Sequence, residues 1–419
     1  MSSGKRSIPA SKKRSRRRSK SCSGEALPVP GFRYAGVHCG VKQAELDLAM
    51  IVSEVPASVA GVFTQSTIVS APVTWCRPRA AAGRARAIVA NSGCANTALG
   101  ERGERDAASM ASHAAKALGC SADHVFVAST GVIGEPLPMA AIRSGIRQAG
   151  SELAANGLRK AAEAIRTTDT FAKFAGVKAS INRKPVTLAG IAKGSGMIEP
   201  NMATMLSFLT TDVAASPAYL RGALRRVADQ TYNRVTIDGE GSTSDTVLLL
   251  ANGLAGNAPL RSARSPGAAR FEAALLEVAE QLARMLARDG EGATKLVTVD
   301  VTGAKNPKQA DRAARRIANS LLVKTAIFGR DPNWGRILQT IGAGRVEVKL
   351  PRVEVKLCGV PVFRAGSATG RRARDRAEAG LAADEISIEV HLAAGRSRAR
   401  IWTCDLSYDY VRINAEYTT

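Results

Sequence analysis

The chain has few of the residues from which common catalytic and metal sites are built. Its 419 residues include only four histidines and seven cysteines, and no two cysteines form a Cys-x-x-Cys pair. Only His38 stands beside a cysteine, Cys39. Disulfide frameworks and zinc sites need clustered ligands, so we predict neither a disulfide framework nor a metal site. Scattered, unpaired cysteines fit a reducing compartment best, and we expect a cytoplasmic location.

Three sequence signatures are also absent. No Gly-x-Ser-x-Gly elbow is paired with a histidine, which disfavours a Ser-His-Asp hydrolase. No Gly-x4-Gly-Lys-Ser/Thr run exists, so nucleotide binding through a P-loop is not supported. The longest apolar runs, such as 247–251, are far shorter than the ~18 residues that a membrane helix needs, and we therefore expect no membrane span.

Acidic residues are scarce near the N-terminus. The chain carries a net charge of +23, and residues 5–20 hold nine basic groups and no acid. Residues 1–27 contain too little apolar surface to offset the entropy of ordering, so we expect a disordered basic tail there. A solvated arm and an organellar targeting peptide both remain open for it. Nucleic-acid binding is disfavoured, because the tail has no aromatic residue that could stack on bases.

The rest of the chain has the composition of a globular protein, with apolar runs interleaved with helical patterns. This alternation predicts an α/β or α+β fold. The clearest helix covers 266–288, with Ser265-Pro266 at its start, and a second helix begins after Ser216-Pro217. The expected strands are 87–90, 124–128, 187–192, 205–211, 246–251, 296–301, 323–328 and 386–392.

Glycine-rich turns that carry hydroxyl groups are the candidates for chemistry. They lie at 128–134, 193–206 and 232–246. Each is by itself typical of an ordinary turn after a strand. In the second turn, Thr204 directly precedes an apolar strand. Its hydroxyl could act as a nucleophile with its own α-amine as base, if the Ala203–Thr204 bond were cleaved; from spacing alone, an ordinary strand-opening threonine remains the alternative.

At these residues the sequence resembles the ornithine acetyltransferase family, also called bifunctional arginine-biosynthesis proteins. The resemblance covers residues 30–419. The matching motifs stand in the order that the family has, at 36–42, 91–96, 129–134, 167–170, 193–206, 290–295, 328–336 and 405–419.

The resemblance implies a self-cleaving N-terminal-threonine enzyme with layered sheets and helices. The precursor would cut itself before Thr204 into an α fragment (28–203) and a β fragment (204–419), which remain one folded unit and assemble as an α2β2 heterotetramer. Thr204 would take the acetyl group from N-acetylornithine and pass it to glutamate. Acetyl-CoA is a second acetyl donor in some members, and no other cofactor is expected. A related self-cleaving aminopeptidase or amidase is the alternative.

The resemblance also assigns roles to individual residues. The hydroxyl of Thr130 and the backbone N–H of Gly131 would stabilise the oxyanion. Lys193, with Thr167 or Thr168, would bind the substrate, whose α-carboxylate needs a cation and hydroxyl donors. The remaining expected substrate contacts are Glu291, near the ornithine ammonium, and Asn414 and Thr419 at the C-terminus.

Two positions depart from the family pattern. Ser244 stands where an asparagine is common, in the run 240–246, which bears on local substrate contacts. Cys94 replaces a more usual asparagine in the loop 91–96, and we expect this change to affect packing rather than catalysis. Neither change touches Thr204.

Overall fold

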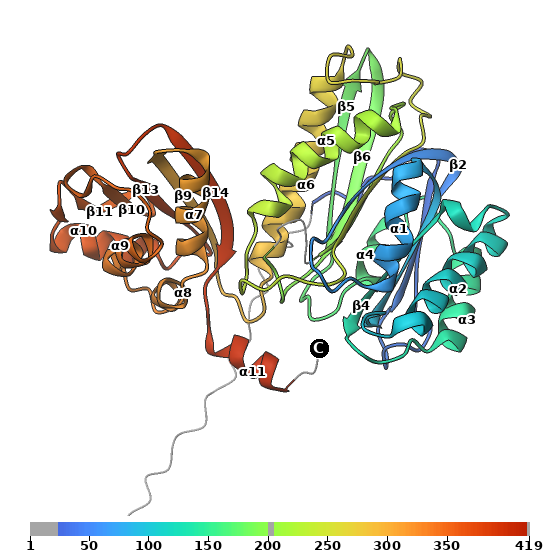
Figure 1. Cartoon of the computed structure of the whole chain (residues 1–419), viewed down its shortest axis with the longest axis horizontal. Coiled ribbons are helices and arrows are strands. Elements are labelled where there is room, and N and C mark those ends of the chain that lie inside the picture. The colour runs from blue at the N-terminus through green and yellow to red at the C-terminus, as the bar shows by residue number, and fades with distance from the viewer. Residues whose placement is uncertain (1–23, 200–204, 417–419) are drawn as a thin grey trace, which may run out of the picture.

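The computed structural model describes residues 24–199 and 205–416 (Figure 1). The larger of its two sheets has the strand order β4-β3-β2-β8-β7-β6-β5, with β1 paired to β2. Its eight strands are β1 (Phe32–Val37), β2 (Leu48–Phe63), β3 (Arg84–Cys94), β4 (Val125–Val132), β5 (Lys173–Ile181), β6 (Lys184–Lys193), β7 (Leu206–Thr211) and β8 (Thr246–Ala251).

The long strand β2 divides this sheet into two stacked layers. Its first part, 48–52, pairs with β1 and β3, whereas 58–63 pairs with β8, and the register shifts between these parts. A shared inner core contains apolar side chains from both sides, including Ile51 and Ile88 from one and Phe208 from the other. The Tyr34 hydroxyl reaches Thr210 Oγ1 across this core at 2.8 Å. Side chains alternate along the strands, so the opposite faces of both layers must be covered by helices.

Helices provide that cover on both outer faces (Figure 1). Two of them pack on the β1–β4 layer and form a separate apolar cluster with it, and two others pack on β6, β7 and β8. The helices of the large unit are α1 (Ala71–Ala82), α2 (Gly100–Leu118), α3 (Met139–Ser151), α4 (Leu158–Ala164), α5 (Pro217–Gln230) and α6 (Ala268–Arg288).

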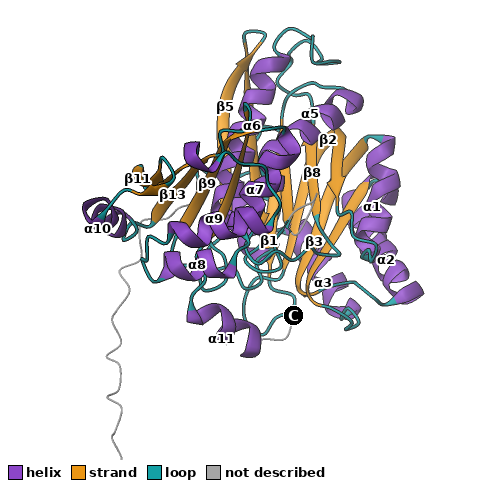
Figure 2. Ribbon diagram, turned by 60° about the vertical axis from the view of Figure 1, so that its left-hand side comes forward, coloured by secondary structure: helices purple, strands orange, loops and turns teal. Residues whose placement is uncertain are grey.

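The smaller sheet belongs to a second unit with its own apolar core. Its strand order is β12-β11-β10-β13-β9-β14. After β14 the chain returns toward the large unit as α11 (Figure 2). The elements are β9 (Leu296–Ala304), α7 (Pro307–Ala318), α8 (Leu321–Phe328), α9 (Trp334–Ala343), β10 (Glu354–Leu357), β11 (Val360–Arg364), β12 (Ser367–Ala368), α10 (Arg371–Gly380), β13 (Glu385–His391), β14 (Ser397–Cys404) and α11 (Tyr408–Glu416).

The predicted α/β class is confirmed, and seven of the eight expected strands coincide with strands. The strand expected at 323–328 is wrong, because this run is part of helix α8. Ser320 caps that helix by accepting a hydrogen bond from the Val323 N–H at 3.3 Å, and Val323 and Ile327 face the core of the small unit at helical spacing. A short apolar run does not by itself distinguish a buried strand from a buried helix.

The two predicted helix starts have different outcomes. Ser216 caps α5 as expected, accepting from the Tyr219 N–H at 3.3 Å. The start predicted at Ser265-Pro266 is wrong, because α6 begins after Gly267, which has a φ of 84°. The Ser265 hydroxyl instead accepts backbone N–H groups of the preceding turn.

The predicted end of the disordered tail, at residue 27, is wrong, because the last residues of this segment contact the fold. Gly24 N donates to Phe174 O at 2.8 Å, and the Leu27 side chain is buried in the inner core. Gly24 and Leu27 therefore attach this end of the chain to the fold, while Glu25 and Ala26 between them are exposed. Residues 1–23 and the boundary between the predicted fragments, at Ala203 and Thr204, lie outside the described ranges. None of the helices in these ranges is both long and apolar enough to span a membrane.

Candidate functional site

A cavity of about 240 Å³ lies where strand ends of the two layers face each other. Seven of the predicted site residues line it together: Thr130, Gly131, Thr167, Thr168, Lys193, Glu291 and Asn414. The remaining predicted residues, Ala203, Thr204 and Thr419, are outside the described part of the chain. Met205 and Leu206 also line the cavity, so the chain that directly follows position 204 is at the site.

The strand register explains why these segments meet. Lys193 ends β6 and pairs with Leu206 at the start of β7, and Leu206 pairs with Thr246 at the start of β8. Thr130 comes from β4 in the other layer. The Lys193 ammonium donates to Thr130 Oγ1 at 3.1 Å and so connects the two layers across the cavity.

Gly131 occupies a position that only glycine can fill. Its φ is 130°, and a Cβ atom there would lie 2.3 Å from the carbonyl carbon of Gly93 on the neighbouring strand. Such a contact is closer than atoms can approach, so any side chain would push β3 and β4 apart. The close approach fixes the backbone of 130–131 beside the cavity.

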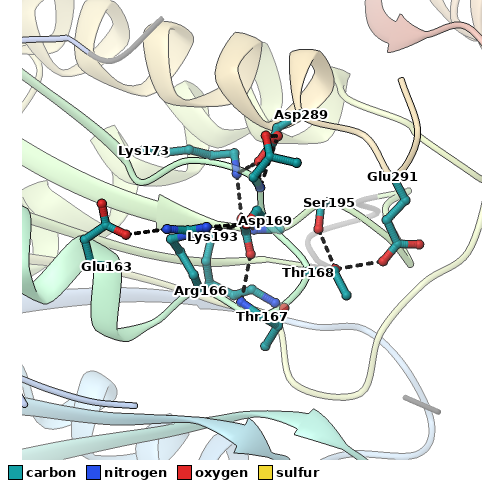
Figure 3. A network of polar contacts seen from close by, with 12 residues as sticks. Glu163, Arg166, Thr167, Thr168, Asp169, Lys173, Lys193, Ser195, Asp289 and Glu291 are labelled. Carbon is teal, nitrogen blue, oxygen red and sulfur yellow. Dashed lines mark hydrogen bonds and ion pairs between the residues drawn. The ribbon is translucent and has the colours of Figure 1, made fainter. Parts of the chain in front are cut away.

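A chain of hydrogen bonds runs along one wall of the cavity (Figure 3). Thr168 Oγ1 donates to Glu291 Oε1 at 2.7 Å and lies 2.6 Å from Ser195 Oγ. Because the Thr168 hydrogen is given to Glu291, the Ser195 hydroxyl must be the donor to Thr168. Asn414 Nδ2 donates to Glu291 Oε2 at 2.8 Å, which brings helix α11 to the site. Both oxygens of Glu291 are thus held in place.

The charged groups of the cavity are strongly influenced by burial. Burial lowers the pKa of Lys193, while the charge of Asp169 opposes this change. Burial raises the pKa of Asp245 well above its usual range, against bonds from backbone groups of Met205 and Ser242. Asp245 is 2% exposed, and its Oδ2 has no hydrogen-bond partner among the residues described. A buried carboxyl in this state favours its neutral form.

Sequence reasoning missed several residues that contribute to the site. Asp245, Asp238 and Tyr410 line the cavity, and burial, with the charge of Asp238 next, raises the pKa of Tyr410 to about 12. Asp169 lies inside the recognised motif 167–170 but had no assigned role. Behind it, Lys173 forms a buried ion cluster with Asp169, four positions earlier, and with Asp289, which is too distant in sequence for a local pattern to show the pairing.

The two departures from the family pattern occupy different surroundings. Ser244 lines the cavity, and its hydroxyl lies 3.3 Å from Thr97 Oγ1. The Cys94 side chain is buried outside the cavity lining, with its thiol donating to Glu135 O at 3.3 Å. In residues 24–199 and 205–416, no group of three or more His, Cys, Asp or Glu side chains is arranged to hold a metal ion.

The layers, the strand ends and this set of charged and hydroxyl groups define an α/β enzyme that acts on a small polar molecule. Comparison with known proteins then identifies the protein family. The ArgJ family model matches residues 33–419. The chain belongs to the ArgJ family, and this membership makes it an acyltransferase of arginine biosynthesis. The resemblance read from the motifs is thereby confirmed.

Two curated relatives match nearly the whole chain, and a solved structure matches part of it. The arginine biosynthesis bifunctional protein ArgJ of Geobacter sulfurreducens is 46% identical over 394 residues, which cover 94% of this chain and 100% of that protein. The protein of the same name from Symbiobacterium thermophilum is 47% identical over 410 residues, covering 95% and 99%. A crystal structure of ornithine acetyltransferase from Mycobacterium tuberculosis, complexed with ornithine, is 36% identical over 43% of this chain and 97% of that chain, with a TM-score of 0.38.

Proposed function

We propose that the chain is a glutamate N-acetyltransferase of the cyclic arginine pathway, which moves the acetyl group from N2-acetylornithine to glutamate. The reaction passes through an acetyl-Thr204 intermediate and requires prior self-cleavage between Ala203 and Thr204. The observation that carries the proposal is the common cavity, where Thr130, Lys193 and Glu291 meet beside Met205.

The charges of the cavity match those of the substrates. N2-acetylornithine has an α-carboxylate and a side-chain ammonium, and glutamate shares the α-carboxylate. Lys193 is the cation for the carboxylate, and Glu291 is the anion for the ammonium. Thr167, Thr168, Asn414 and Thr419 add the neutral donors and acceptors around them.

Acyl transfer requires a nucleophile, a base and a stabilised oxyanion. Thr204 Oγ attacks the acetyl carbonyl, and the α-amine of Thr204, with an ordinary pKa of about 7.7–8.0, takes the proton. The Thr130 hydroxyl and the Gly131 N–H donate to the oxyanion. Because Thr130 Oγ1 already accepts from Lys193, its own hydrogen is available for this bond. Ornithine then leaves with the proton, and the glutamate amine attacks the acetyl-threonine.

The broader setting follows the family resemblance. Acetyl-CoA is an alternative acetyl donor and no other cofactor is needed. The enzyme acts in the cytoplasm, with organellar targeting through the basic N-terminus as the alternative. Its fragments assemble as an α2β2 heterotetramer, for which the exposed apolar side chains of α8 and α11 offer a contact surface: Leu321, Leu322, Tyr408 and Val411.

Processing and activity test the proposal together. Denaturing gels should show two fragments, and the second should begin Thr204-Met205-Leu206. Thr204→Ala should abolish both cleavage and transfer, whereas Thr204→Ser should keep some of each because the hydroxyl remains. The purified protein is then incubated with N-acetylornithine plus glutamate, and separately with acetyl-CoA plus glutamate.

Two results would overturn the assignment. An uncleaved chain with full activity would exclude the α-amine of Thr204 as base, since an amide nitrogen cannot take the proton. Cleaved protein that hydrolyses peptide amides and fails to acetylate glutamate would favour the aminopeptidase alternative.

A further inference from the structure

A buried ion cluster lies behind the cavity wall (Figure 3). The Lys173 side chain is completely buried, and its ammonium donates to Asp169 Oδ1 at 2.6 Å and to Asp289 Oδ2 at 2.5 Å. We call these three residues the Lys173 triad. Burying charges is expensive, and such clusters often contribute less stability than apolar groups of the same size would. The contacts of the two carboxylates point to a role beyond stability.

Asp169 connects the triad to two substrate-binding segments. Its Oδ1 also accepts from Gly194 N at 2.7 Å, directly after Lys193, and its Oδ2 accepts from Thr167 N at 3.0 Å. One carboxylate therefore fixes the backbone beside Lys193 and the backbone at Thr167, and both residues are proposed to bind the substrate.

Asp289 connects the triad to the segment that carries Glu291. It accepts from the Thr170 N–H at 3.0 Å and from the Thr170 hydroxyl, and it stands two positions before Glu291. Glu291 N in turn donates to Ser195 O at 2.7 Å. A Cβ atom on Gly196 would lie 2.5 Å from the Glu291 carboxylate, so the loop after Lys193 packs directly against that carboxylate.

The triad also contributes an electric field. With one ammonium and two ionised carboxylates, its formal net charge is −1, although burial raises the pKa of Asp289 against the charge of Lys173. Burial alone would raise the pKa of Asp169, but Lys173 and Lys193 lower it, so this carboxylate stays ionised. Among the charges acting on Lys193, that of Asp169 has the largest effect. Within the triad, Asp169 thus favours a cationic Lys193, while the charge of Lys173 acts in the opposite direction.

We propose that the Lys173 triad is a positioning unit that sets the separation of Lys193 and Glu291, and that this separation selects substrates with both an α-carboxylate and a side-chain cation. The identity of the substrate rests on the proposed function. The separation itself follows from contacts on both sides: Asp169 fixes the Lys193 segment, Asp289 fixes the Glu291 segment, and Lys173 holds the two carboxylates together.

Discrimination between two acetyl donors tests this role. N-acetylornithine carries the side-chain ammonium, and N-acetylnorvaline has the same carbon chain without it. The ratio of their kcat/KM values, with glutamate as acceptor, measures recognition of the ammonium. Lys173→Met should lower this ratio by roughly 10²-fold, since small misplacements of binding groups have effects of that size. Asp289→Asn should lower it about 10-fold, mostly through the KM for N-acetylornithine.

Lys324→Met is the matched control. Lys324 is also buried, at 3% exposed, and donates to Thr403 Oγ1 and Cys404 O in the small unit. This variant should lose stability while its discrimination ratio stays within about 2-fold of the wild type. A merely structural role of Lys173 would lower activity with both donors equally.

A milder variant keeps the proposal testable if Lys173→Met does not fold. Thr170→Val removes only the hydroxyl that Asp289 accepts, and its ratio should fall several-fold. Cleaved, folded Thr170→Val and Asp289→Asn with the wild-type ratio would overturn the positioning role. Failure of the wild type to transfer acetyl from N-acetylornithine would instead refute the proposed function, so the two failures are distinguishable.

Discussion

The two units of the molecule bury a lysine in different ways. In the large unit, Lys173 lies between two carboxylates, Asp169 and Asp289, that hold the segments proposed to bind the substrate. In the small unit, Lys324 donates to the neutral oxygens of Thr403 and Cys404. The small unit carries ion pairs at its surface, such as Lys305–Glu347, whose side chains are about half exposed and contribute little. The buried ion pairs of Lys173 therefore lie beside the candidate site, whereas the buried ammonium of Lys324 has only neutral oxygen partners.

The small unit nevertheless reaches the cavity through α11, the helix that follows its last strand. Asp405 follows β14 directly, and its carboxylate accepts from Thr294 N at 2.7 Å, from the Thr294 hydroxyl and from Lys295 N at 3.0 Å. The Ser407 hydroxyl donates to Gly292 O at 2.6 Å. These contacts place α11, and with it Asn414, against the loop that carries Glu291. The small unit acts as a support for one wall of the site.

The largest expected effect on the large unit comes from Thr130, the proposed oxyanion donor. Thr130→Ala should lower kcat by roughly 10²-fold with little change in KM, because the oxyanion develops only in the transition state. Steady-state kinetics, after cleavage has been verified on a gel, measure this effect. A variant with unchanged kcat would remove Thr130 from the chemistry.

An intermediate effect is expected at the connection between the units. Asp405→Asn should lower the free energy of unfolding by about 2 kcal/mol and kcat/KM by roughly 10-fold, because it weakens three hydrogen bonds of a buried carboxylate beside the Glu291 loop. Denaturant unfolding and steady-state kinetics measure both quantities.

Asp300→Asn is the control for this prediction. Asp300 pairs with Arg400 at the surface of the same unit, at 2.7 Å, and its loss should change stability by less than about 1 kcal/mol and leave kinetics unchanged. If Asp405→Asn and Asp300→Asn changed the kinetics equally, Asp405 would not be the residue that supports the Glu291 wall of the cavity.

A smaller effect is expected from pH. Because burial lowers the pKa of Lys193, this group should lose its proton at a pH below the ordinary lysine range of about 10.4. Raising the pH then removes the cation that we propose binds the α-carboxylate, so the KM for glutamate should rise several-fold on the alkaline side. Lys193→Arg, whose guanidinium stays charged, should flatten this rise. A rise of equal size in Lys193→Arg would assign the effect to another group.

The site was largely predictable from motifs, but its support was not. Thr130, Lys193 and Glu291 stand in short matching runs, and the structure brings them to one cavity. Lys173 and Asp289 are 116 positions apart, and only the folded chain shows that they form an ion pair. The helix at 321–328 was missed for a related reason: its apolar residues form a continuous run, and the cap at Ser320 is the only local signal that distinguishes it from a strand.

The smallest effect is expected at the N-terminus, where the two ends of the predicted tail should behave differently. Deleting 1–23 should leave transfer between N-acetylornithine and glutamate unchanged within error, because in the described part of the chain the residues that line the cavity lie between Ala95 and Asn414. Deleting 1–27 also removes Leu27, which is 6% exposed, and the bond from Gly24 N to Phe174 O. Burial of a leucine contributes roughly 1.5–3 kcal/mol, so this longer deletion should lower Tm by a few degrees while kcat and KM at low temperature stay the same. Thermal unfolding and kinetics on the two truncations decide the point. Loss of activity already in the shorter truncation would mean that the basic residues take part in the reaction, and an unchanged Tm in the longer one would mean that residues 24–27 do not belong to the folded core.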